Sequence, residues 1–260
     1  MKRRTPMTST LQDWLDKHEP TTPLLYWCHT TNVSGFREML RGDALNPQMC
    51  NVFKSDLSYF FYGRPAYRFK GDPSLLDAHA WPVVLVFKNT IENFSCSAFP
   101  FDSGAFRSGR YQKWLDSAWE IDSFKIDVAS TTHARHVAAF YEGNGDYLDG
   151  NGKRFHSTSF GLNLEAKAVS EMIRECRDGG ADDRRFTVEM IVDAPIPLDP
   201  QYVAMVIIPS ALADSVEVAP LASRGIRVYP YRVITHLTAS HHHALLENVV
   251  FDRQNEEGKL

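Results

Sequence analysis

The sequence predicts an α+β fold, and three observations support this prediction. Short apolar runs typical of buried strands occur towards both ends of the chain, at 24–28, 83–87 and 202–208. A helical periodicity is clearest over 164–176, where apolar side chains recur on one face. The composition is that of a folded globular protein, since 43% of the 260 residues are hydrophobic and 23% are charged. We therefore expect one domain, spanning 1–260.

The N-terminal part of the chain reads as helix, strand and helix. An amphipathic helix is expected over 9–18, and it ends before the first of two prolines. The apolar run 24–28 predicts a buried strand. Apolar side chains at helical spacing follow from Val33 to Leu40, and Gly42 is a typical helix stop.

The rest of the chain predicts further strands around an insertion. The segment 94–160 is interpreted as an insertion, with helix candidates over 111–119 and 130–141. A strand over 186–192 alternates its side chains between two faces, and strands are also expected at 202–208 and 226–229. The polar end of the chain, 248–260, is expected to be a flexible tail.

Composition excludes several classes of protein. No apolar run approaches the roughly 20 residues of a membrane helix, and the basic start lacks the apolar stretch of a secretory signal. The four cysteines form no CxxC pair. The histidines at 133 and 136 and at 241–243 have no further ligand at metal spacing, so no metal is expected. These features predict a cytoplasmic protein that makes no use of a membrane.

The first candidate segment of the site follows the strand at 24–28. His29 and Thr31 come where the strand passes into a helix, so their polar groups lie near backbone N–H groups. Such an arrangement suits a ribose hydroxyl and a carboxamide. The alternative is that the two side chains only cap the helix.

The second candidate segment is the aromatic run 57–68. Its tyrosines, among them Tyr62 and Tyr67, could stack on a flat ring, and Arg64 could lie against a diphosphate. The alternative is an aromatic core segment that leaves through a Gly-Arg-Pro turn.

The third candidate segment contains a carboxylate within an apolar strand. Glu189 is flanked by Val188 and Met190, and burial of such a charge is costly unless the group is paired or functional. The alternative is a half-exposed strand, with Thr187 and Glu189 on its solvent face.

Taken in order, the three segments resemble the ADP-ribosyltransferase superfamily, and more narrowly its DarT-type toxins, which modify DNA bases. The opening motif of that family is matched by His29, Thr31, Gly35, Phe36, Met39 and Leu40. The aromatic Arg-Pro motif resembles 60–67, and the late strand with the catalytic glutamate matches 187–192. The chain departs from the family where Gly35 replaces a common asparagine and where Arg64-Pro65 lacks the usual spacer.

This resemblance implies a split β-sandwich with an NAD-binding cleft and helical insertions. It implies NAD+ as co-substrate, with His29 on the adenosine-side ribose, Thr31 and Gly35 in the cofactor motif, and Tyr62 or Tyr67 stacked on the nicotinamide. Arg64 would hold the diphosphate or the developing charge. Glu189 would be the catalytic carboxylate of a reaction that needs no metal.

The resemblance also implies an acceptor and a biological setting. Arg184 and Arg185 would contact a nucleic-acid target, either single-stranded DNA or RNA, with Arg107 and Arg110 as further cations. Acidic side chains nearly balance the basic ones over 157–185, and this balance leaves a protein target open. Members of such families are commonly held in check by a cognate antitoxin protein, which implies a toxin–antitoxin or antiphage role. The alternative class is a catalytically degenerate binding module of the same fold.

Overall fold

The computed structural model confirms the α+β class. It describes residues 10–66, 77–128, 131–156, 158–174 and 183–260. The chain divides into two compact units, each built from interleaved segments. The first unit contains Met1–Pro23, Ser97–Met190 and Leu260, and the second contains Leu24–Cys96 and Ile191–Lys259. That the whole chain acts as one catalytic domain stays a prediction.

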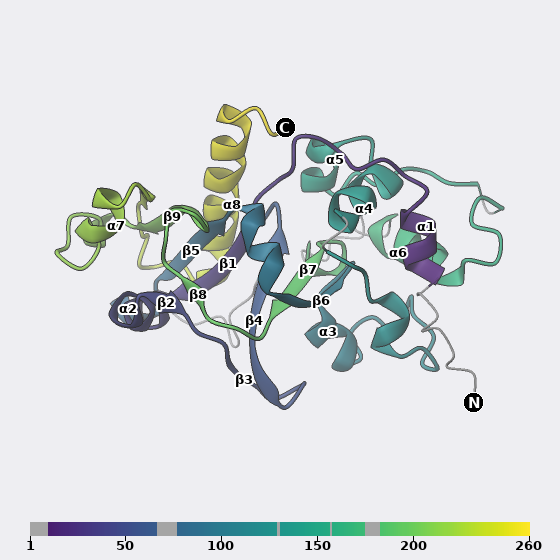
Figure 1. Ribbon diagram of the computed structural model, residues 1–260, viewed down its shortest axis with the longest axis horizontal. Helices are drawn as coiled ribbons and strands as arrows, with labels where there is room; N and C mark the ends of the chain where they lie inside the picture. The colour runs from purple at the N-terminus through teal and green to yellow at the C-terminus, as the bar shows by residue number, and fades with distance from the viewer. Residues whose placement is uncertain (1–9, 67–76, 129–130, 157, 175–182) are drawn as a thin grey trace. The chain divides into compact units, whose positions relative to one another are not determined.

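The second unit is built on a β-sheet whose strands follow the order β10-β9-β5-β1-β4, with β3 paired to β4 (Figure 1). β5 runs antiparallel to both β1 and β9, whereas β10 is parallel to β9. The strands are β1 (Trp27–Asn32), β3 (Gln48–Cys50), β4 (Ser55–Tyr62), β5 (Pro82–Phe87), β9 (Val203–Pro209) and β10 (Arg227–Tyr231), and β2 (Ala44–Leu45) pairs separately with β8 (Ile196–Pro197).

The helices of the second unit are α2 (Val33–Gly42), α7 (Ala219–Ser223) and α8 (Ala239–Glu256), with 3-10 turns at Ala78–Ala80, Asn89–Phe94 and Ser210–Leu212. α8, the yellow helix in Figure 1, packs Leu246 and Val250 against Cys28 and the apolar side chains of β5 and β9. All residues of β5 and β9 are buried, which explains why their sequences are continuous apolar runs. The predicted strands at 83–87 and 202–208 are therefore confirmed.

The first unit is mainly helical. Its helices are α1 (Thr10–Leu15), α3 (Ser103–Arg107), α4 (Thr132–Phe140), α5 (Asn144–Asp149) and α6 (Leu164–Arg174), with 3-10 turns at Ile121–Phe124 and Asp183–Arg185. α1 packs on both α4 and α6. The prediction of a helix over 111–119 is wrong. α3 ends at Arg107, Gly109 adopts a left-handed φ of 75°, and the chain continues in turns.

The chain passes between the two units within β6 (Ser95–Phe99) and β7 (Glu189–Val192). β7 begins later than the sequence predicts, because Asp183–Arg185 forms a 3-10 turn. The Thr187 hydroxyl donates to the Asp183 carbonyl at 2.7 Å and helps to close this turn. All four residues of β7 are buried, so the alternative of a half-exposed strand is wrong.

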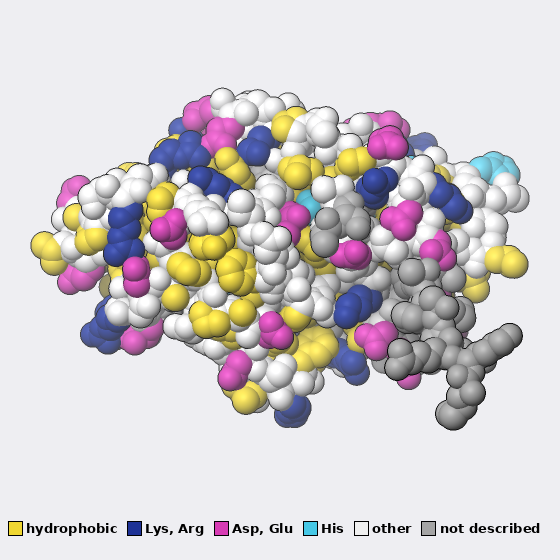
Figure 2. Space-filling view, viewed as in Figure 1, with side chains coloured by type: hydrophobic (Ala, Val, Ile, Leu, Met, Phe, Trp, Pro, Cys, Tyr) yellow, Lys and Arg dark blue, Asp and Glu magenta, His cyan; other side chains and the backbone are white. Residues whose placement is uncertain are grey.

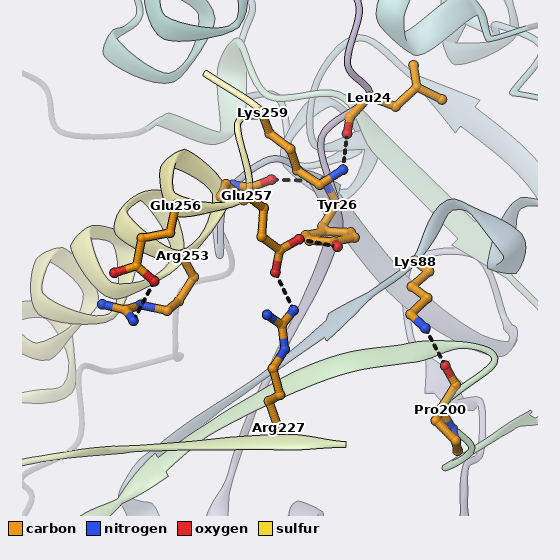
Figure 3. Close-up of polar contacts among 10 residues, drawn as sticks. Leu24, Tyr26, Lys88, Pro200, Arg227, Arg253, Glu256, Glu257 and Lys259 are labelled. Atoms are coloured by element: carbon orange, nitrogen blue, oxygen red, sulfur yellow. Dashed lines mark hydrogen bonds and ion pairs between the residues drawn. The ribbon is translucent and has the colours of Figure 1, made fainter. Parts of the chain in front are cut away.

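The C-terminal segment 248–260 is not a flexible tail. Much of it lies in α8, and the residues that follow are tied to the second unit by polar contacts (Figure 3). Glu257 accepts hydrogen bonds from Tyr26 and Arg227, and the Lys259 ammonium donates to the Leu24 carbonyl at 2.6 Å. Some of the polar side chains of this segment therefore have specific partners in the second unit.

Candidate functional site

A pocket of about 480 Å³ lies in the second unit where β1 passes into α2. The hairpin of β3 and β4, in which Gln48 pairs with Leu57, also contributes side chains to the pocket lining. The pocket is lined by His29, Thr30, Thr31, Asn32, Gly35, Met39, Leu45, Asn46, Gln48, Met49, Cys50, Leu57, Ser58 and Tyr59. Three of the predicted cofactor-binding residues, His29, Thr31 and Gly35, are thus brought together.

The Nε2 nitrogen of the His29 ring can accept a hydrogen bond. Its Nδ1 lies 2.9 Å from the Tyr59 carbonyl, and a carbonyl only accepts, so Nδ1 carries the proton. Burial lowers the pKa of His29 below its ordinary value and favours the neutral ring. Nε2 is consequently unprotonated and can accept a hydrogen bond from a hydroxyl group such as that of a ribose.

The first turn of α2 is arranged around Gly35. The Asn32 side chain caps the helix by accepting from the Gly35 N–H at 2.9 Å. A Cβ atom at position 35 would collide with the Thr31 hydroxyl oxygen. Glycine at this position therefore lets the Thr31 hydroxyl lie against the helix at the pocket wall. The alternative, in which His29 and Thr31 only cap α2, is wrong, because Asn32 supplies the cap.

The hairpin wall adds residues that the sequence reading missed. The Tyr59 hydroxyl donates to the Cys50 sulfur at 2.8 Å, which joins the two strands of the hairpin. Met49 is exposed over 63% of its surface although it lines the pocket. Residues 51–54 between the two strands read Asn-Val-Phe-Lys, so Asn51 is the one typical turn residue among them and the local signal for this hairpin is weak.

Tyr62 and Arg64 lie in the core of the second unit and do not line the pocket. The Tyr62 hydroxyl accepts from the Leu25 N–H at 2.9 Å, and its ring packs on Trp27 with a centroid separation of 5.0 Å. Arg64 is 3% exposed, and its Nη1 lies 3.3 Å from an oxygen of Glu247. The alternative reading of this segment as aromatic core is the one that the structure supports. Tyr67 lies outside the described residues.

Glu189 is a buried carboxylate held by one serine of the first unit. Glu189 is 1% exposed, and its Oε2 accepts both the backbone N–H of Ser103, at 3.0 Å, and the Ser103 hydroxyl. Ser103 begins α3, which Asp102 caps by accepting from the Ala105 N–H at 2.7 Å. Two donors fixed by a helix start compensate part of the cost of burying this charge.

The two predicted acceptor-binding arginines differ in their surroundings. Arg184 pairs with Asp102 at 3.3 Å, so it supports the turn that precedes Ser103. Arg185 is 8% exposed, and its guanidinium lies over the Trp114 ring, 4.9 Å from the centroid. Within the described residues, its Nε and Nη2 have no hydrogen-bond partner. A buried cation without an anion is costly and is a candidate site for an anionic ligand.

A second hollow of about 320 Å³ lies in the first unit within the segment 106–119. Phe106, Tyr111 and Trp119 contribute rings to it, and Gln112 contributes an amide. Arg107 also lines this hollow, whereas Arg110 does not. The hollow is therefore aromatic and polar.

The described part of the chain contains no cluster of three or more His, Cys, Asp or Glu side chains arranged to hold a metal ion. None of its helices is both long and apolar enough to cross a bilayer.

Comparison with known proteins gives a similarity of structure but none of sequence. No model of a known family matches the chain, and no curated protein matches its sequence. A solved structure described as "Thermus sp. 2.9 DarT in complex with NAD+" is similar with a TM-score of 0.40 and 9% sequence identity. The match covers 82% of this chain and 98% of that one.

Proposed function

We propose that the chain is an NAD+-dependent ADP-ribosyltransferase. The observation that carries this proposal is the pocket at the start of α2, where the neutral His29 ring offers Nε2 as an acceptor beside the Thr31 hydroxyl. These groups suit a nucleoside, because ribose hydroxyls donate to Nε2 and an amide or hydroxyl of the ligand can pair with Thr31. The volume of the pocket suits part of a dinucleotide rather than the whole molecule.

Glu189 is assigned as the catalytic carboxylate. In the proposed reaction the bond between nicotinamide and C1′ of its ribose breaks, and the electron pair leaves with nicotinamide. The carboxylate stabilises the oxocarbenium-like ribose that develops. It then accepts the proton of the attacking acceptor group as the new bond to C1′ forms. The two hydrogen bonds from Ser103 would hold the carboxylate in one orientation throughout.

We further propose a nucleic-acid acceptor, either single-stranded DNA or RNA. Arg185 supports this choice, since a buried guanidinium stacked on Trp114 suits a phosphate next to a base. The charge distribution is also compatible with a protein acceptor, because acidic and basic side chains are interspersed on the face shown in Figure 2. A toxin role in the cytoplasm, with a cognate antitoxin protein as partner, follows from the sequence resemblance.

The proposal is tested by incubating the protein with NAD+ labelled in its adenylate part, together with separate pools of DNA, RNA and protein. We expect label on nucleic acid and release of nicotinamide. Glu189→Gln should abolish both, whereas Glu171→Gln, on the exposed face of α6, should retain them. Label confined to the protein pool would replace the acceptor that we propose.

The second candidate, a catalytically degenerate binding module, gives a different result. It would bind NAD+ without releasing nicotinamide, and Glu189→Gln would leave that binding unchanged. Absence of NAD+ binding by the wild-type protein would reject both candidates.

A further inference from the structure

We propose that Gln254 on α8 is a positioning residue that holds His29 in the pocket by setting the separation of β1 and β4. All residues through which Gln254 acts on His29 belong to the second unit. The expected consequence of this action for NAD+ binding rests on the proposed function.

The ladder between β1 and β4 is short. Only two residue pairs form it, Trp27 with Tyr62 and Cys28 with Phe61. In an antiparallel pair the next hydrogen-bonded residues, Tyr26 and Gly63, would exchange both of their N–H···O bonds. One of these bonds is made, from the Gly63 N–H to the Tyr26 carbonyl at 2.7 Å.

The side-chain amide of Gln254 replaces the other bond. Its Oε1 accepts from the Tyr26 N–H at 2.9 Å, and its Nε2 donates to the Gly63 carbonyl at 2.9 Å. The amide therefore stands between the two strands as an additional peptide group would. Gln254 has no exposed surface, so water cannot take over either bond.

The other end of the same ladder is bridged by His29. Its Nδ1–H donates to the Tyr59 carbonyl of β4 at 2.9 Å, where direct pairing of the strands has ended. Two side-chain bridges thus bound a ladder of two residue pairs, and one of them is the pocket histidine. A change in strand separation at Gln254 is transmitted over this short distance to the His29 bridge.

α8 fixes the Gln254 amide in place. Glu247 and Phe251, which lie seven and three residues before Gln254 on this helix, both contact Arg64, next to Gly63. Beyond the helix, Glu257 holds Tyr26 itself, as Figure 3 shows. Contacts on both sides of Gln254 therefore prevent the helix from sliding relative to β1 and β4.

The test measures His29 directly, in the full-length protein, by its ring ¹⁵N signals and by its pKa in an NMR titration. In Gln254→Leu, which removes both bonds, we expect changed ¹⁵N shifts and a pKa closer to the ordinary value. The affinity for NAD+ should fall by up to about tenfold, and kcat should change by a smaller factor. The matched control is Gln12→Leu. Gln12 is also buried and uses its amide on Thr132 and the Asp127 N–H, but it lies in the first unit.

Gln254→Glu provides a second test that does not depend on the leucine variant folding. A protonated carboxyl group can still accept from the Tyr26 N–H and donate to the Gly63 carbonyl, whereas a carboxylate cannot donate. The His29 signals should therefore resemble those of the wild type at about pH 5 and depart from them at about pH 8. Unchanged His29 signals in both Gln254 variants, or equal changes in Gln12→Leu, would overturn the inference. If His29 responds as expected but the wild type binds no NAD+, only the proposed function fails.

Discussion

Ser103 donates two hydrogen bonds to a single oxygen of Glu189, one from its backbone N–H and one from its hydroxyl. The backbone donor is fixed by the start of α3, so the side chain of residue 103 decides whether the second donor is present. This relationship makes Ser103 a means of testing the Glu189 assignment without altering the carboxylate.

Ser103→Ala should lower the rate of transfer while leaving NAD+ affinity nearly unchanged. Loss of one donor to a buried carboxylate costs about 1–3 kcal/mol, which corresponds to a decrease of about 5-fold to 150-fold in kcat. The measurement is kcat and KM for nicotinamide release. Ser108→Ala is the control, because the Ser108 hydroxyl donates to the Ala105 carbonyl in the same unit and not to Glu189. Equal rates for wild type and Ser103→Ala would argue against the role of Glu189 in the reaction.

Gly35→Ala should weaken NAD+ binding. The added methyl group collides with the Thr31 hydroxyl oxygen, so that hydroxyl or the start of α2 must move. We expect a loss of affinity of about tenfold, measured by calorimetry. Gly42→Ala on the same helix is the control, since its methyl group would meet only Asn46 Nδ2, at 3.5 Å. The double variant Gly35→Ala/Thr31→Ala should recover part of the affinity by removing the collision.

Arg64→Gln should act on stability more than on catalysis. Arg64 pairs with Glu247 in the core, and removal of one partner leaves the other charge without compensation. Because Glu247 is partly exposed, we expect a loss of about 2 kcal/mol in the free energy of unfolding, measured in urea. Adding Glu247→Gln should restore much of this loss. A large fall in kcat at unchanged stability would instead support the catalytic role that the sequence resemblance implies.

Lowering the pH should destabilise the protein through His133 and His136. Burial lowers the pKa of both side chains to about 3, and the proximity of the two rings adds to the effect on His133. In the unfolded chain their pKa is about 6.5, so the unfolded state binds more protons between about pH 6.5 and pH 3. The free energy of unfolding therefore falls as the pH falls through this window, by about 2 kcal/mol per histidine at pH 5.

Urea unfolding at about pH 7.5 and pH 5 measures this dependence. His136→Leu should remove part of it, because His136 packs against Phe140 and its two ring nitrogens have no hydrogen-bond partner in the described structure. His156→Leu should leave it unchanged, since His156 is exposed. Wild-type stability that is equal at the two pH values would show that these histidines accept protons in the folded protein.

Local sequence was sufficient for the part of the candidate site that is contiguous in the chain. His29, Thr31 and Gly35 lie within seven consecutive residues. A strand that leads directly into a helix brings such residues together whatever the rest of the chain does. The buried strands at β5 and β9 were also predictable, because burial on both faces requires a continuous apolar run.

Other features depend on partners that are distant in sequence. Ser103 meets Glu189 across 86 residues, and Gln254 meets Tyr26 across 228. Tyr62 and Arg64 matched a motif, yet their side chains pack in the core of the second unit, where Leu25 and Glu247 supply partners. The polar C-terminal segment was expected to be flexible for the same reason, since its partners just before β1 and on β10 are not adjacent to it in the sequence.

Periodicity and local motifs thus establish the α+β class, the buried strands and the polar groups around His29, because each depends on neighbours a few residues away. The tertiary structure decides which of the matched side chains reach the pocket, which serine holds Glu189, and what fixes the strand that carries His29. A buried polar group must be satisfied by whichever partner the fold brings to it, and that partner is set by long-range packing rather than by local spacing.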